Sequence, residues 1–309
     1  MDDTDSATVS SVADVYRCLL ENGIRATKTV WSFDSPTGTP LAGDTLEDSA
    51  HRTWLRGLRD AGFEIGYHGA AAAPSTRERS RAALERFRDV VGDYPRTYAS
   101  HSGQLEAMYW GSARFTGGWR AGFSLGQRIF RPGLEFSGEV EGSPYFWGDL
   151  CRDKIEYVRN LTFHDINTLT CDPLMPYHDP AKPYVRYWFS ASNAPQARDF
   201  VALLSPKNLN RLAEEGGACI VYSHLAYGYM DGGRVDPRVR RAVETLGKMN
   251  AWCVPVAVLL DHLRARPSWR SEVDPAALRR MQARWFWENS WGKRTKLMRR
   301  LRQRMFHRA

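Results

Sequence analysis

The succession of predicted helices and strands constrains the fold of this chain more than any other feature. Apolar residues recur at helical spacing over 9–20, and an apolar strand pattern follows over 24–31. The same order of helix and strand returns over 46–67 and again over 75–100. Regular alternation of this kind is typical of a parallel α/β sheet or barrel.

This regularity is lost in the middle of the chain and then returns. Residues 104–205 are rich in aromatic side chains and show no clear period, so we expect this region to be irregular. Beyond it, the pattern predicts strands at 218–223 and 252–255. It also predicts helices at 206–215, 237–249, 256–264, 276–287 and 293–305.

Histidines stand at the ends of three predicted strands, and two aspartates open the chain. His68, His101 and His224 each follow a strand, whereas Asp2 and Asp3 precede the first helix, where such residues also serve as helix caps. Because the carboxyl ends of parallel strands converge on one face, we expect these side chains to meet there. Carboxylate and imidazole together suit a divalent transition metal, with Zn²⁺ as the first choice.

A site of this composition predicts metal-assisted hydrolysis of an amide or ester bond. A metal ion of this kind lowers the pKa of a bound water and polarises a carbonyl group. A neighbouring carboxylate would then act as the base, and a histidine would protonate the leaving group.

Several segments resemble motifs of the polysaccharide deacetylase superfamily, carbohydrate esterase family four, over roughly residues 2–263. Asp2-Asp3-Thr4 resembles the opening Asp-Asp-Gly motif, and Glu-Ile-Gly-Tyr-His over 64–68 is similar to the strand end of the second motif. Val-Tyr-Ser-His over 221–224 resembles the late Leu-x-x-His motif. The stretch 101–111 is similar to a little-characterised branch of this superfamily.

The resemblance implies a distorted (β/α) barrel with fewer than eight strands and a role for each matched residue. Asp2 would be the general base and His224 the general acid, while Asp3 and His68 would bind the metal. The assignment could also be reversed, with Asp3 as the base and Asp2 as the ligand, and Asp5 is a further candidate for the site.

Two departures from the family's pattern affect these expectations. The second metal-binding histidine of the family would fall at Ala72, so we expect His101 to replace it as a ligand. The family's first strand, which delivers the aspartate pair, has no counterpart before Asp2, so we expect that strand to lie upstream of Met1.

The positive charge of the chain is concentrated near its C-terminus. From Arg264 to Ala309 there are 14 basic and 3 acidic residues, interleaved with tryptophan. We therefore divide the chain into a catalytic domain over 1–266 and a basic amphipathic helical tail over 267–309. Such a tail suits an anionic membrane surface, with packing on the barrel as the alternative, and no nucleic-acid motif accompanies it. No apolar run approaches membrane-spanning length. No signal segment is visible before Asp2, so we expect a cytoplasmic protein, with peripheral membrane contact through the tail as the further option.

These features together predict a metal-dependent hydrolase that deacetylates an N-acetylated or acylated sugar, or a polysaccharide precursor. Tyr109 and Trp110, in the aromatic middle region, would bind the sugar. The alternative is a catalytically inactive carbohydrate-binding or scaffold protein that kept the barrel after losing a ligand at Ala72. A third reading is a hydrolase of another bond on the same scaffold, such as an ester or a cyclic amide.

Overall fold

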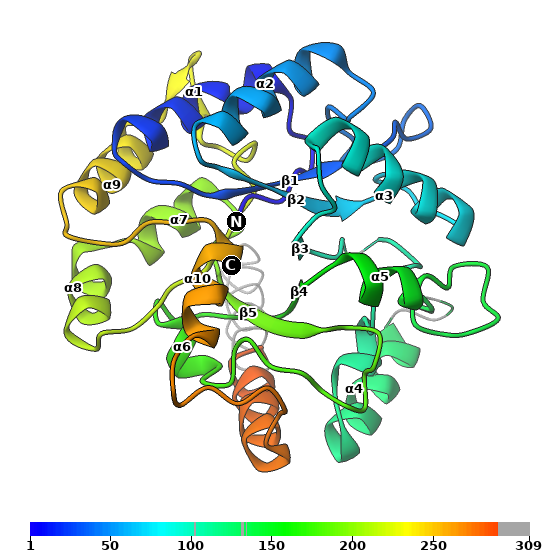
Figure 1. Ribbon diagram of the computed structural model, residues 1–309. Helices are drawn as coiled ribbons and strands as arrows, with labels where there is room; N and C mark the ends of the chain where they lie inside the picture. Colours follow the sequence, from blue (N-terminus) through cyan, green and yellow to red (C-terminus); the bar gives the residue numbers. More distant parts are fainter. Residues whose placement is uncertain (102, 131–132, 134, 290–309) are drawn as a thin grey trace, which may run out of the picture.

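The computed structural model describes all residues except 102, 131–132, 134 and 290–309. Six parallel strands lie side by side in sequence order, and helices surround the curled sheet (Figure 1). The predicted parallel α/β fold is therefore confirmed. The strands are β1 (Thr27–Trp31), β2 (Glu64–Gly69), β3 (Thr97–Tyr98), β4 (Tyr157–Phe163), β5 (Tyr187–Asn193) and β6 (Val221–Tyr222), with a separate antiparallel pair, β7 (Met230–Asp231) and β8 (Arg234–Val235).

The helices follow the strands in the alternation that the periodicity predicts outside the middle region. They are α1 (Val9–Glu21), α2 (Ser49–Asp60), α3 (Arg77–Val91), α4 (Gly117–Phe130), α5 (Gly148–Lys154), α6 (Thr168–Cys171), α7 (Ala197–Leu203), α8 (Pro206–Glu214), α9 (Pro237–Gly247) and α10 (Val256–Arg264), with a 3₁₀ turn, η1, at Gly111–Arg114. Local signals fix their ends. Thr8 caps α1 by accepting a hydrogen bond from the Ser11 amide, and α3 ends at Gly92, whose φ of 98° suits glycine.

The first residues of the chain close the gap between the two edge strands. Asp2 pairs in parallel with Lys28 of β1 and with Ser223, which follows β6. The Asp2 amide donates to the Thr27 carbonyl at 2.8 Å, and the Asp3 amide donates to the Ser223 carbonyl at 2.8 Å. This bridge joins both edges of the sheet and directs the residues after Asp2 to the carboxyl ends of the strands.

The middle region is more regular than its sequence pattern predicts. It contains β4 and β5, which pair with each other in parallel, and the prediction of an irregular segment over 104–205 is wrong at these strands. Both are buried along most of their length, so they lack the alternation of apolar and polar residues that marks a half-exposed strand.

The strand predicted at 252–255 does not form. Cys253 accepts one backbone hydrogen bond from the Arg25 amide at 3.2 Å, and the side chain of Trp252 is 58% exposed. The short apolar run at 252–255 predicts a strand, but a run of this length is equally compatible with a loop that covers the core.

The first part of the basic tail packs on the barrel. A helix over 275–289 places Trp285 and Phe286 against Phe115, with ring centroids 5.0 and 4.7 Å from it. Arg284 on the same helix forms an ion pair with Asp165 at 3.1 Å. These aromatic side chains therefore stabilise the barrel, while the predicted helix at 293–305 lies outside the described residues. The boundary at 266/267 stays a prediction. In the part of the chain that is described, no helix combines the length and apolarity needed to cross a bilayer.

Membrane contact by the tail can be separated from this packing. We predict that a chain ending at residue 289 loses binding to vesicles rich in phosphatidylserine, because residues 290–309 contain eight basic and no acidic side chains. Co-sedimentation of the full and shortened chains measures the effect, and vesicles of neutral lipid are the control. Equal binding of both chains to anionic vesicles would refute the contact.

A buried carboxyl group in the core makes stability depend on pH. Asp172 is fully buried and accepts a hydrogen bond from the Ser190 hydroxyl at 2.7 Å. Burial raises its pKa to about 7. In the unfolded chain an aspartate titrates near pH ~4, so between these values the folded protein holds a proton that the unfolded chain has lost. Stability should therefore fall as pH rises through this window.

The Asp172→Asn variant should lack this pH dependence of stability, because an amide side chain stays neutral. We expect the variant to gain stability relative to the natural chain by up to about 4 kcal/mol between pH ~4 and ~8. Urea unfolding of both proteins at the two pH values measures the difference. An identical dependence on pH in the two chains would contradict the assignment.

Candidate active site

Four titratable side chains meet at the carboxyl end of the sheet. His68 lies in β2, His101 follows β3, His224 follows β6, and Asp5 comes shortly after the Asp2 bridge. All four side chains are buried, with exposed fractions of 0, 8, 7 and 5%. The strand order thus brings together the three histidines that the sequence places at strand ends.

The carboxylate of Asp5 lies among the three imidazoles. Its Oδ1 is 3.2 Å from His68 Nε2, and its Oδ2 is 3.1 Å from His224 Nε2 and 3.6 Å from His101 Nε2. Burial by itself would raise the pKa of Asp5, but the hydrogen bonds from His224 and His68 outweigh it and hold the pKa well below its usual range. Asp5 is therefore an ionised carboxylate at the centre of the cluster.

The ring nitrogens of His224 and His101 have opposite surroundings. His224 Nδ1 lies 3.0 Å from the Pro195 carbonyl, so this ring can donate from both nitrogens, to Pro195 and to Asp5. Burial lowers the pKa of His224, but the bond to Asp5 raises it and the net direction is upward. The Nδ1 of His101 instead accepts from the Gly103 amide at 3.3 Å, and burial lowers the pKa of His101. The cluster therefore favours a charged His224 beside a neutral His101.

Asp3 lies beside this cluster, paired with an arginine. Its two oxygens accept from the Arg159 guanidinium at 2.7 and 2.6 Å, and Asp3 Oδ2 is 4.0 Å from His68 Nε2. Burial opposes ionisation of Asp3, but the Arg159 charge outweighs it and lowers the pKa of Asp3. Arg159 also lies over the ring of Tyr222, 4.4 Å from its centroid. Arg159 was missed at the sequence level because it lies in β4, within the region predicted to be irregular.

Asp2 is not part of the cluster. Its Oδ2 accepts from the Tyr16 hydroxyl at 2.8 Å and lies 3.1 Å from Lys28 Nζ, and its Oδ1 accepts from the Leu225 amide at 2.8 Å. Each carboxylate oxygen is already engaged by buried donors of the fold. The predicted base thus sits where it anchors α1 and β1, on a different set of partners from Asp3 and Asp5.

Gln104 joins the loop that follows β2 to the loop that carries His101. Its Nε2 donates to the Ala71 carbonyl at 3.0 Å, and its Oε1 accepts from the His101 amide at 3.2 Å. Gly69 makes this approach possible, because a Cβ at that position would lie 2.0 Å from Gln104 Nε2 and its φ is 138°. A side chain at residue 69 would therefore displace Gln104 and the loop of His101.

The two predicted sugar-binding residues differ in accessibility. Tyr109 is only 8% exposed, its ring packs on Trp188, and its hydroxyl accepts from the Tyr184 amide at 3.3 Å. Trp110 is half-buried and lies beneath the Arg114 guanidinium. Of this pair, Trp110 is the side chain with surface left to offer a ligand.

The donor set of the cluster fits a zinc-type metal ion. One carboxylate and three imidazoles are donor types that zinc takes, and the Asp5 oxygens lie 3.1–3.6 Å from the three Nε2 atoms. His101 Nε2 is buried without a hydrogen-bond partner among the described residues. In the described part of the chain, no three ligating side chains already surround one open point. Metal binding therefore requires Asp5 to turn from hydrogen bonding to ligation.

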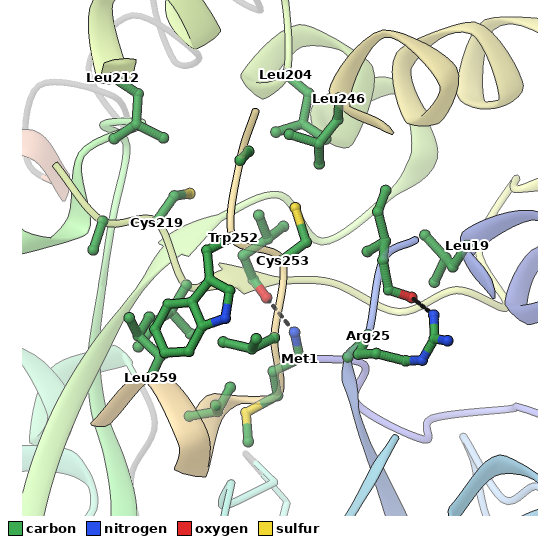
Figure 2. Close-up of a pocket in the computed structure, with 18 of the residues that line it drawn as sticks. Met1, Leu19, Arg25, Leu204, Leu212, Cys219, Leu246, Trp252, Cys253 and Leu259 are labelled. Carbon is green, nitrogen blue, oxygen red and sulfur yellow. Dashed lines mark hydrogen bonds between the residues drawn. The ribbon is translucent and has the colours of Figure 1, made fainter. Parts of the chain in front are cut away.

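An apolar cavity of about 600 Å³ lies at the other end of the sheet (Figure 2). Leucines of the surrounding helices, Trp252 and Cys253 line it, and at its edge the Met1 amino group donates to the Val221 carbonyl at 2.7 Å. The cavity lies between the residues that precede β1 and the residues that precede β6. The strand that we expect upstream of Met1 stays a prediction. The cavity holds none of the four clustered side chains and is separate from the candidate site.

Comparison with known proteins gives likenesses of fold. No protein-family model and no curated protein matches the chain. A polysaccharide deacetylase candidate from Mycobacterium smegmatis is 15% identical with a TM-score of 0.49, covering 86% of this chain and 82% of its own. The allantoinase Puue is 15% identical with a TM-score of 0.46, covering 84% and 74%. A second deacetylase candidate, from Pseudomonas aeruginosa PAO1, is 14% identical with a TM-score of 0.43, covering 84% and 74%.

Proposed function

We propose that this protein is a metal-dependent hydrolase that removes an acyl group from an N-acetylated or otherwise acylated sugar. The observation that carries the proposal is the ionised Asp5 carboxylate surrounded by three imidazoles at the carboxyl end of the sheet. Groups of these types gathered in a buried cluster are the combination that hydrolytic metal sites use.

Asp5, His68 and His101 would hold the metal. Asp5 takes the ligand role predicted for Asp3, because its carboxylate lies 3.1–3.6 Å from the Nε2 atoms of all three histidines, whereas Asp3 Oδ2 is 4.0 Å from His68 Nε2. Ligation through His101 Nε2 would move the ring proton to Nδ1 and replace the contact with Gly103. When bound, the metal would supply Lewis acidity toward an acyl carbonyl and lower the pKa of a water.

Asp3 is our candidate for the base. The Arg159 charge keeps this carboxylate ionised and fixes its orientation, and the carboxylate lies beside the cluster. Asp2, the base expected from the resemblance, is committed to Tyr16, Lys28 and the Leu225 amide. A proton taken from water therefore has a nearer acceptor in Asp3.

His224 is our candidate for the acid. Its Nδ1 is held by the Pro195 carbonyl, and its Nε2 faces Asp5, an arrangement that favours the protonated ring. Protonation of the leaving amine requires a group that carries its proton at the pH of the reaction. Tyr222, whose hydroxyl is 3.4 Å from His224 Nε2, holds the ring from the side.

Acyl release from defined sugars tests this function. We expect acetate release from N-acetylated sugars to be lost after chelation and restored by Zn²⁺, and to be lost in His224→Gln. His164→Gln is the matched control, because His164 is exposed and its hydrogen bond to Glu288 comes from its backbone amide, which the substitution keeps. Sugar binding without acyl release by the metal-loaded protein would favour the carbohydrate-binding alternative. Acyl release from esters alone would show that the protein hydrolyses ester bonds and not amide bonds.

A further inference from the structure

Arg114 presents a cation that the fold does not neutralise. It ends η1 and is half-buried, and its guanidinium lies 3.3 Å above the centre of the Trp110 ring. Among the described residues, the guanidinium has no hydrogen bond and no ion pair. Buried or half-buried arginines are normally paired with a carboxylate, since an uncompensated charge in such a place is costly.

The surroundings of Arg114 add positive charge. Burial, together with the charge of Arg159, lowers the pKa of Arg114 to about 9, so that it remains protonated at neutral pH. Tyr222 acts in the opposite direction and raises the pKa of Arg114. Lys182, which lies close enough to be influenced by Arg114, is already paired with Asp179 at 3.0 Å. The charge of Arg114 therefore has no countercharge among the described residues.

The position of Arg114 is fixed, and it is close to the candidate active site. Lys182 Nζ donates to the Arg114 carbonyl at 3.1 Å, which holds the end of η1 in place. Stacking on Trp110 occupies one face of the guanidinium, and no described residue forms a hydrogen bond with its nitrogen atoms. Arg159, which binds Asp3, and Tyr222, which contacts His224, both act electrostatically on Arg114, so its charge lies within electrostatic range of the candidate active site.

We propose that Arg114, supported by Trp110, binds an anionic oxygen group of the substrate close to the acyl group that is removed. This inference rests on the proposed function and narrows its substrate to an acidic sugar. The planar fork of a guanidinium matches two oxygens of a carboxylate or of a phosphate. A uronate and a sugar phosphate therefore share the recognised chemistry, and the experiment distinguishes them.

Calorimetric binding to the zinc-loaded full chain tests the subsite without requiring turnover. The probes are an N-acetylated aminouronic acid, N-acetylglucosamine 6-phosphate and neutral N-acetylglucosamine. We expect Arg114→Gln to weaken binding of the preferred anionic probe at least about tenfold and to leave the neutral probe unchanged. Arg114→Lys should recover part of the loss, because it restores the charge but not the fork. Arg120→Gln is the control for net charge, because Arg120 is an exposed residue of α4.

The outcomes separate this inference from the proposed function. If Arg114→Gln and Arg120→Gln bind both anionic probes as the natural chain does, the subsite is refuted, whatever the hydrolytic activity. If binding of the anionic probe depends on Arg114 but no acyl group is released from any probe, Arg114 belongs to a binding site and the hydrolase proposal fails. Thermal unfolding of each variant checks that the loss does not come from misfolding.

Discussion

Asp5→Asn should lower kcat/KM for acyl release by at least about a thousandfold while the chain remains folded. The amide keeps the shape of the side chain but loses the charge that faces His68, His101 and His224. Removing a ligand withdraws the several kcal/mol of charge stabilisation that a metal supplies to hydrolysis, and about 1.4 kcal/mol corresponds to a factor of ten. Steady-state kinetics and metal analysis of the purified variant measure the effect.

A matched substitution shows whether the loss is specific. Asp60→Asn removes the same charge from the exposed end of α2 and should leave kcat/KM and metal content unchanged. Wild-type kinetics in Asp5→Asn would place the chemistry elsewhere and remove Asp5 from the site.

Asp2→Asn should act on stability, with a loss of about 3–5 kcal/mol. Lys28 Nζ is almost inaccessible and lies 3.1 Å from Asp2 Oδ2 and 3.1 Å from the Thr4 hydroxyl. Without the carboxylate, a buried ammonium loses its countercharge, and the single oxygen of the amide cannot accept from both the Tyr16 hydroxyl and the Leu225 amide. Urea unfolding measures the change in free energy.

A second substitution isolates the ion pair as the cause. Asp2→Asn combined with Lys28→Met should be more stable than Asp2→Asn alone, because the double variant has no unpaired buried charge. If Asp2 were the catalytic base, Asp2→Asn would instead abolish activity with stability nearly unchanged. That result would restore the role that the sequence resemblance implies.

The strand ends could be predicted from sequence because they depend on periodicity alone. His68, His101 and His224 lie at or just after the ends of strands whose order along the chain is also their order in the sheet, so their convergence follows from a parallel fold. The same reasoning failed for β4, whose seven residues include Arg159 and Asn160 in buried positions. Polar residues inside a fully buried strand remove the pattern on which the prediction depends.

The choice between the three aspartates could not be made from spacing. Asp2 and Asp3 have different partners because the chain is extended at the bridge, where successive side chains point to opposite faces. Asp5 reaches the imidazoles through the turn that follows, in which Ser6 has a positive φ of 55°. The partner of Asp3 lies in β4, 156 residues away, and no local pattern indicates it.

The most direct test of the central claim is the anomalous diffraction of crystals of the full chain grown with Zn²⁺. We predict one strong zinc peak bonded to Asp5, His68 and His101 at about 2.0–2.2 Å, and its disappearance in Asp5→Asn. A structure with saturating zinc and no peak among these side chains, or with Asp5 still hydrogen-bonded to His68 and His224 as it is here, would contradict the metal-dependent mechanism.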